Sequence, residues 1–275
     1  MRNFVDCAWV EKHMDDEELF IIDCRFGLFD ASYGKGAYAK GHIKNAFYLD
    51  INEDLSGAQK AHGGARPVPE LSILGKKLEK MGLRMDSQIV CYDDRTYSSA
   101  RGWWQLKNMG FENVYILNGG YEAWKQLGLP ISKECPEARQ GGSIKIEQFH
   151  DIYCDIEYVK KAMLNSNIVL LDSREHRRYT GEYEPLYSKN GHIPGAMNLH
   201  WQKNVKDDGR LKERSMLEKN FSFVNSKMEI ITYCGSGIDG ALNFVILDEL
   251  GYKVRLYVGS ISDWISYEEN ILECV

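Results

Sequence analysis

Short apolar runs alternate with amphipathic stretches along the chain. In its first half, the runs predict strands and the stretches between them predict helices. The expected strands are 20–24, 46–49, 89–93 and 113–117, and the expected helices are 70–81, 98–109 and 120–127. Strands separated by helices are typical of a mostly parallel sheet that is covered by helices on both faces. The pattern therefore predicts an α/β fold.

The same pattern occurs twice. The matched segments are "IIDCRF" with "LLDSRE", "GHIKNA" with "GHIPGA", "IVCYDD" with "IITYCG", and "NVYILNGGYEAW" with "KVRLYVGSISDW". Four matches in one order indicate a duplication. The stretch 130–150 contains two prolines and a pair of adjacent glycines, so it has the character of a linker. We expect two similar domains, residues 1–138 and 139–275.

Composition and charge narrow the class of protein. The chain has 275 residues, of which 44% are hydrophobic, enough for two domains of ordinary size. No apolar run reaches the ~18 residues of a membrane span. The first twenty residues also lack the basic start and apolar centre of a signal peptide. We therefore expect a cytoplasmic protein with no membrane partner. The net charge of −6, with scattered lysines and arginines, disfavours a nucleic-acid partner but allows a local pocket for a small anion.

Seven cysteines are present, and no two have C-x-x-C spacing. An odd count without that spacing disfavours both a disulfide framework and a metal site. Most free cysteines are small buried side chains, which suits Cys24 and Cys91 in their strand-like runs. Cys234 differs because it follows the apolar run 230–233 and precedes a glycine-rich loop. A helix is expected after that loop, from about 241 to 250.

The position of Cys234 suggests a reactive thiol. Ligands of parallel sheets bind where strands end and loops lead into helices. Useful ionisation of a thiol near pH 7 requires ~2.7 kcal/mol, and a helix start supplies only ~0.3–1 kcal/mol. Glycines allow successive N–H groups to face inward, and two or three such hydrogen bonds, at ~1.5–3 kcal/mol each, supply the rest. We therefore predict a thiolate held by loop amides; the alternative is a buried structural cysteine.

The first repeat has no cysteine at this point. An ungapped match between the two loops places Asp93 opposite Cys234. The loop that contains it, "DDRTYSSA", also lacks glycine. We expect the first copy to be inactive and the second copy to carry the chemistry.

These features together resemble the two-domain rhodanese-type sulfurtransferases, and the resemblance covers essentially the whole chain. In that family a loop cysteine takes a sulfane sulfur from a donor, forms a persulfide, and passes the sulfur to a thiol or to cyanide. No metal or organic cofactor takes part. "CGSG" is similar to the loop of the 3-mercaptopyruvate sulfurtransferases, whereas thiosulfate sulfurtransferases carry basic residues there. The resemblance implies 3-mercaptopyruvate or thiosulfate as the small anionic donor.

The resemblance also implies roles for polar residues around the loop. Ser236 matches a serine that, in the mercaptopyruvate enzymes, joins a histidine and an acid of the first domain. His62, in "HGGARPVP", is the best match for that histidine. Asp50 lies near the position of the acid, but Asn52 occupies it.

For the substrate, Arg178 in "SREHRRY" matches the family's substrate-binding arginine, and a guanidinium suits a carboxylate or sulfonate. Arg174 is interpreted as a structural partner of Asp172. Lys189 is the only cation where the mercaptopyruvate enzymes have a second arginine. Asp239 is expected to cap the helix rather than face the sulfur. The substrate-binding part of the loop is expected to comprise Gly235, Gly237, Ile238, Asp239 and Gly240.

Two other classes of function remain open. A cysteine-based phosphatase needs an arginine six residues after the cysteine, and Gly240 stands there. A non-turnover sulfur carrier or a degenerate rhodanese-like binding module is a second alternative, because Asn52, Lys189 and Asp239 all depart from the family pattern.

Overall fold

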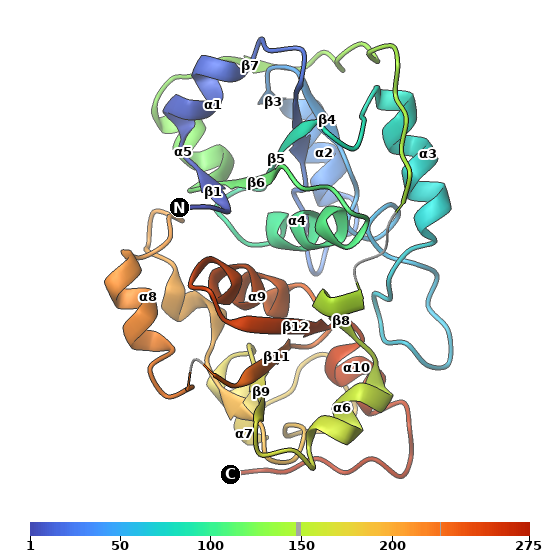
Figure 1. Cartoon of the computed structure of the whole chain (residues 1–275), viewed down its shortest axis with the longest axis vertical. Helices are drawn as coiled ribbons and strands as arrows, with labels where there is room; N and C mark the ends of the chain where they lie inside the picture. Colours follow the sequence, from blue (N-terminus) through green and yellow to red (C-terminus); the bar gives the residue numbers. More distant parts are fainter. Residues whose placement is uncertain (147–149, 226) are drawn as a thin grey trace. The chain divides into compact units, whose positions relative to one another are not determined.

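The computed structural model describes residues 1–146, 150–225 and 227–275, which form two compact units (Figure 1). Unit 1 comprises Met1–Gly57, Val68–Phe149 and Lys206–Leu211, and unit 2 comprises Ala58–Pro67, His150–Val205 and Lys212–Val275. Two segments therefore belong to a different unit from their neighbours in the chain. One of them, Ala58–Pro67, lies within the first sequence repeat but makes its contacts in unit 2.

Unit 1 is built on a five-stranded parallel sheet. Its strand order is β1-β6-β5-β2-β4. The strands are β1 Phe4–Val5, β2 Leu19–Asp23, β4 Ala46–Tyr48, β5 Gln88–Tyr92 and β6 Val114–Leu117. A separate antiparallel pair joins β3 His42–Ile43 to β7 Ile131–Ser132.

Helices cover both faces of this sheet (Figure 1). They are α1 Cys7–His13, α2 Tyr33–Lys40, α3 Leu71–Met81, α4 Ser99–Asn108 and α5 Gly120–Gln126. Apolar residues of α1 and α5 form one core with Ile21 and Val90. On the opposite face α4 packs closely, because a Cβ on Gly102 would lie only 2.7 Å from Cys24 Sγ. Cys24, directly after β2, and Cys91, within β5, are fully buried, as the sequence analysis expected.

Unit 2 repeats this architecture with the corresponding order β10-β9-β11-β12-β8, again parallel throughout. Its strands are β8 Tyr153–Cys154, β9 Ile168–Asp172, β10 Met197–Asn198, β11 Glu229–Tyr233 and β12 Lys253–Tyr257. The register is repeated as well: Tyr92 pairs with Asp23 in unit 1, and Tyr233 pairs with Asp172 in unit 2. The equivalent pairs show that the two sheets are matched residue by residue.

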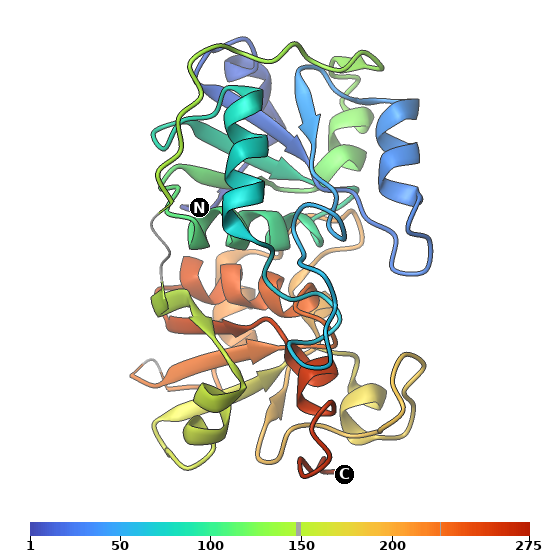
Figure 2. The same ribbon diagram turned by 90° about the vertical axis from the view of Figure 1, so that its right-hand side faces the viewer.

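The helices of unit 2 are α6 Ile156–Ala162, α7 His176–Thr180, α8 Arg214–Asn220, α9 Asp239–Glu249 and α10 Ser260–Trp264, with 3₁₀ turns η1 His150–Ile152 and η2 Trp201–Asn204. Apolar residues of α6 and α10 form a core with Ile231 and Tyr233. Figure 2 shows α9 lying along β12 on the other face. None of the helices in the described ranges has both the length and the apolar content needed to cross a membrane.

The expected α/β fold is confirmed. Each strand and helix expected from the sequence has a counterpart whose ends differ by at most two residues. In unit 1 the sequence pattern missed the two-residue strands β1, β3 and β7 and the helices α1 and α2. The first of these helices is only seven residues long, and the second contains two glycines, so neither carries a clear helical signal. In α1, Asp6 fixes the start by accepting a hydrogen bond from Trp9 N at 2.8 Å.

Candidate active site

Cys234 directly follows β11, at the carboxyl end of the sheet in unit 2. Its side chain is 1% exposed. The loop that it begins is tied to the start of α10: Ile261 N donates to Cys234 O at 3.1 Å, and Ser262 N donates to Gly235 O at 3.0 Å. The cysteine therefore lies between the starts of α9 and α10, at the strand end where the sequence analysis placed it.

Two glycines let the loop curl around the sulfur. Gly237 has a φ of +78°, and its N–H donates to Cys234 Sγ at 3.1 Å. Gly235 lies against Tyr187, whose hydroxyl would be 3.0 Å from a Cβ at that position. A side chain at Gly235 would therefore displace Tyr187 from the loop.

The pKa of the Cys234 thiol is nevertheless raised above its ordinary value. Burial is the main cause, and the negative charge of Asp239 adds to it. The backbone N–H groups of Gly240, Ser236 and Gly237 lower the pKa but do not offset the other two effects. The expectation that the helix start and the loop amides together would hold a thiolate was therefore wrong, because it left out the cost of burying the charge.

Asp239 also differs from its expected role. The helix α9 begins at Asp239 itself, and its N-cap is Ile238, whose side chain makes no capping hydrogen bond. The expected capping role of Asp239 was therefore wrong. Its carboxylate instead lies close enough to disfavour a thiolate at Cys234.

Arg178 lies at the cysteine loop, as the sequence suggested, with Nη2 at 3.4 Å from the Cβ position of Gly235. Its guanidinium is already engaged by a carboxylate that the sequence analysis missed. Arg178 Nη2 donates to Glu184 Oε1 at 2.8 Å, and Nε donates to Oε2 at 3.1 Å. The side chain of Glu184 is fully buried. Much of the positive charge of Arg178 is therefore offset within the protein.

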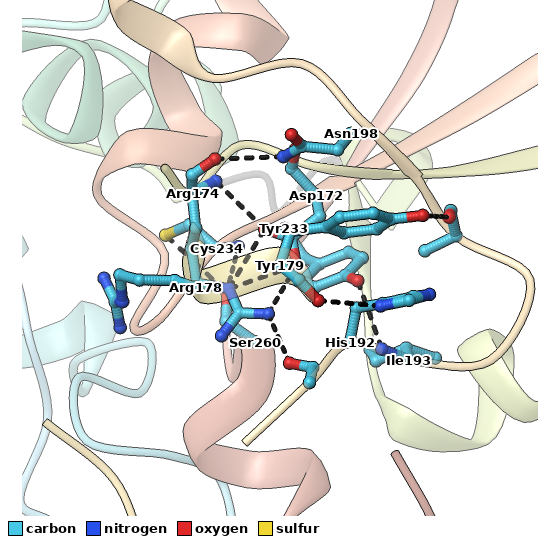
Figure 3. A network of polar contacts seen from close by, with 12 residues as sticks. Asp172, Arg174, Arg178, Tyr179, His192, Ile193, Asn198, Tyr233, Cys234 and Ser260 are labelled. Carbon is cyan, nitrogen blue, oxygen red and sulfur yellow. Dashed lines mark hydrogen bonds and ion pairs between the residues drawn. The ribbon is translucent and has the colours of Figure 1, made fainter. Parts of the chain in front are cut away.

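Arg174 belongs to the same network, and Figure 3 shows it near Asp172 and Cys234. It donates to Asp172 Oδ2 at 2.6 Å, to Gly191 O at 2.7 Å and to Glu184 Oε2 at 3.0 Å. Arg25 makes the first two of these contacts in unit 1, with Asp23 and Gly41. The same pair in both units supports the structural role that was expected for Arg174.

Ser260 is a further polar neighbour that the sequence analysis missed. Its hydroxyl accepts a hydrogen bond from Cys234 N at 3.1 Å and lies 4.0 Å from Cys234 Sγ. It has a φ of +55°, which is unusual for a residue with a side chain. The matching residue of unit 1 is Gly120, with a φ of +59°. A serine where the first repeat has glycine was the sequence signal for this position.

Ser236 receives its hydrogen bond from Arg66, which the sequence analysis did not consider. Arg66 Nη1 donates to Ser236 Oγ at 2.9 Å. Arg66 belongs to Ala58–Pro67, which we call the arginine loop. This loop is anchored on α10, because Gly63 N donates to Asp263 Oδ1 at 2.7 Å and Ala65 N donates to Ser262 Oγ at 2.9 Å.

His62 lies at the other end of the arginine loop. Its Nδ1 is 2.8 Å from Ser266 Oγ, and its ring stacks on Tyr267 with centroids 4.0 Å apart. These contacts fix the loop to the end of α10 and do not involve Ser236. Asp50, near the expected acid, accepts hydrogen bonds from the backbone of Asn52 and Glu53 within unit 1.

The matching loop of unit 1 contains a carboxylate in place of the sulfur. Asp93 is 2% exposed. It accepts hydrogen bonds from the backbone N–H groups of Thr96 at 2.6 Å, of Tyr97 and Ser99 at 2.7 Å, and of Arg95 at 3.0 Å. The loop thus encloses an anion that the protein itself supplies. Across the described ranges, no three His, Cys, Asp or Glu side chains converge as a metal site would require.

Comparison with known proteins agrees with this geometry. The family described as "Rhodanese-like domain" matches residues 6–127 and 155–267. A probable 3-mercaptopyruvate sulfurtransferase of Pseudomonas aeruginosa is 36% identical over 260 residues, covering 92% of this chain and 91% of the relative. A putative thiosulfate sulfurtransferase of Mycobacterium tuberculosis, SseB, is 32% identical over 90% of this chain and 87% of its own length.

Solved structures give the same assignment. The crystal structure of SseA from Escherichia coli, a 3-mercaptopyruvate sulfotransferase, superposes with a TM-score of 0.83 at 30% identity, covering 95% of this chain and all of SseA. The tandem sheets, the single loop cysteine and these relatives lead to one conclusion. The chain belongs to the two-domain rhodanese-type sulfurtransferases.

Proposed function

We propose that this protein moves a sulfane sulfur from 3-mercaptopyruvate or thiosulfate to a thiol or to cyanide through a persulfide on Cys234. The observation that carries the proposal is the contact between Gly237 N–H and Cys234 Sγ in a loop at the end of β11. A hydrogen bond from the backbone stabilises negative charge on the sulfur, and therefore also on a persulfide formed there. The names of the curated relatives support the same chemistry.

The reaction divides into two balanced steps. The Cys234 thiolate attacks the outer sulfur of thiosulfate, the donor's S–S bond breaks, and sulfite leaves with the electron pair. Cyanide then attacks the outer sulfur of the persulfide and leaves as thiocyanate, which restores the thiolate. A thiolate acceptor would leave as its own persulfide in the same way. No metal or organic cofactor enters either step.

The site must first ionise a thiol whose pKa is raised by burial and by Asp239. The proton leaves to solvent, so the reactive fraction grows with pH. The backbone N–H groups of Ser236, Gly237 and Gly240 oppose this rise in pKa and so favour the thiolate once the proton has left.

The test is a comparison of rates with 3-mercaptopyruvate and with thiosulfate, using cyanide as the acceptor. Cys234→Ser serves as the inactive control, and intact mass is recorded after donor alone. Turnover with either donor, together with one added sulfur that is lost in Cys234→Ser, is the expected result. An added sulfur without turnover would instead identify a carrier, and no addition with any donor would identify a binding module.

A further inference from the structure

The contact between Arg66 and Ser236 limits which reactions the site can catalyse. Ser236 lies two residues after the sulfur nucleophile, and its Oγ accepts a hydrogen bond from Arg66 Nη1 at 2.9 Å. A guanidinium has donors only and stays protonated in proteins, so it cannot accept a proton from Ser236. The Ser236–Arg66 pair therefore supplies positive charge and no route for proton transfer.

The position of Arg66 is built into the fold. The preceding residues of the arginine loop are tied to α10 by the hydrogen bonds of Gly63 with Asp263 and of Ala65 with Ser262. Gly64 packs so closely on Gly259 that a Cβ there would lie 2.5 Å from Gly259 O. This anchoring holds the guanidinium at the cysteine loop.

The charge of Arg66 reaches the space around the sulfur. Burial raises the pKa of Tyr187 to about 12, and Cys234 contributes to the rise, whereas the positive charges of Arg178 and Arg66 oppose it. Tyr187 lies against Gly235, so Cys234, Arg178 and Arg66 all act electrostatically on a side chain that packs on the cysteine loop. Arg178 is largely offset there by Glu184, and Asp239 adds negative charge. Arg66 adds positive charge beside the cysteine loop that can attract an anionic donor.

The two donor classes differ in what their leaving groups need. In a thiosulfonate or in thiosulfate, the bond between the outer sulfur and the sulfonyl sulfur breaks, and sulfinate or sulfite leaves as a stable anion without a proton. In 3-mercaptopyruvate the C–S bond breaks, the electron pair stays on carbon, and the donor's thiol proton must move to that carbon to give pyruvate. The first class needs only positive charge, and the second also needs a proton carrier.

We propose that Arg66 is a donor-binding residue that selects sulfur donors with an oxidised sulfonyl leaving group over 3-mercaptopyruvate. The proposal rests on the sulfurtransferase function proposed above. It assigns specificity to a cation outside the cysteine loop, brought to Ser236 by the arginine loop.

The test compares kcat and KM for thiosulfate, benzenethiosulfonate and 3-mercaptopyruvate in four variants. In Arg66→Ala, kcat/KM for the first two donors should fall by about 10- to 100-fold, mainly through KM, as expected for a lost charged hydrogen bond. Arg66→Lys should keep most of this rate. Arg66→His should lose the activity toward thiosulfate and benzenethiosulfonate at pH 8. The same variant should gain 3-mercaptopyruvate turnover, because a neutral imidazole can accept a proton. Lys60→Ala removes an exposed cation of the same loop and should leave all rates unchanged.

The proposal would be overturned by a wild-type preference for 3-mercaptopyruvate of tenfold or more. An equal loss on all three donors in Arg66→Ala, or no loss, would also overturn it. If no donor adds sulfur to wild-type Cys234, the proposed function fails, and Arg66 is then tested by binding. Calorimetry with thiosulfate on Cys234→Ser should show at least tenfold tighter binding than on Cys234→Ser combined with Arg66→Ala. Equal binding by the two proteins would refute the role of Arg66.

Discussion

Glu184 holds Arg178 in a two-point ion pair, with Nη2–Oε1 at 2.8 Å and Nε–Oε2 at 3.1 Å. The same carboxylate also accepts from Arg174 Nη1 at 3.0 Å, and its side chain is fully buried. The expected substrate-binding arginine is thus already bound to an internal anion. A donor that approaches Arg178 must compete with this pair or use the remaining donors of the guanidinium.

Replacing Glu184 by glutamine should have two opposite effects. The change leaves two buried guanidinium groups without their shared anion, so the free energy of unfolding in urea should fall by about 3 kcal/mol. The released charge of Arg178 should lower the KM for thiosulfate several-fold. Glu182→Gln is the matched control, because Glu182 pairs with Arg177 at the exposed surface. That change should cost less than about 1 kcal/mol. An unchanged KM in Glu184→Gln would show that Arg178 does not meet the donor.

Replacing Asp239 by asparagine should make Cys234 more reactive at neutral pH. The carboxylate raises the pKa of the thiol, so its removal should lower that pKa and increase the thiolate fraction. The rate of alkylation by iodoacetamide, measured from pH 6 to 10, should then rise at a lower pH than in the wild type. Asp248→Asn, in the last turn of the same helix, should not shift the profile. If the alkylation rates of Asp239→Asn and the wild type have the same pH dependence, Asp239 does not raise the pKa of Cys234.

The wild-type pH dependence follows from the same raised pKa. Because the protonated thiol is favoured in the folded protein, kcat/KM should still be rising where an ordinary cysteine is already ionised. The folded state binds the thiol proton more tightly than the unfolded state does. The stabilisation from this site is thus complete below the unfolded pKa and is lost as pH rises through the folded pKa. A kcat/KM that stays constant above pH 7 would contradict a thiol pKa that is higher in the folded protein than in the unfolded chain.

Two substitutions of Ser260 can separate the effect of backbone strain from the effect of the hydroxyl group. A left-handed conformation costs a residue with a Cβ roughly 1–2 kcal/mol, and Gly120 avoids this cost at the matching position. Ser260→Gly should therefore be about 1 kcal/mol more stable than Ser260→Ala in urea unfolding, since both lack the hydroxyl. Both should lose activity relative to the wild type, because Cys234 N loses its acceptor. Equal stability of the two variants would argue against strain at this position.

The sequence was sufficient for the parts of the molecule that depend on local pattern. Short runs rich in β-branched and aromatic residues and followed by turn residues, such as Ile230–Tyr233, are typical of buried strands, and the strands expected on this basis were predicted to within two residues. The position of Cys234 followed from the same pattern, because it marks the end of a strand before a glycine-rich loop. The duplication added Asp93 as the counterpart of that cysteine.

The rest depended on contacts between distant residues. Arg66 and Ser236 are 170 positions apart, and nothing local in "HGGARPVP" shows that this loop docks on α10. His62 was chosen because it best matches the histidine of the mercaptopyruvate enzymes, but its ring packs on Tyr267. Glu184 and Asp239 were visible in the sequence, yet their electrostatic effects depend on burial, which a linear pattern does not give. Ser260 could have been found, because the aligned repeats show serine opposite glycine.

The enclosed carboxylate of Asp93 indicates how to inactivate the cysteine loop of unit 2 while keeping its fold. Four backbone N–H groups in unit 1 point at one acidic side chain, so a loop of this shape folds around oxygen as readily as around sulfur. Replacing Cys234 by aspartate copies that solution into the second repeat. Because Asp239 disfavours a negative charge at position 234, the aspartate is combined with Asp239→Asn. This double variant should unfold at nearly the wild-type urea concentration while transferring no sulfur, and so provide a blank for every assay above.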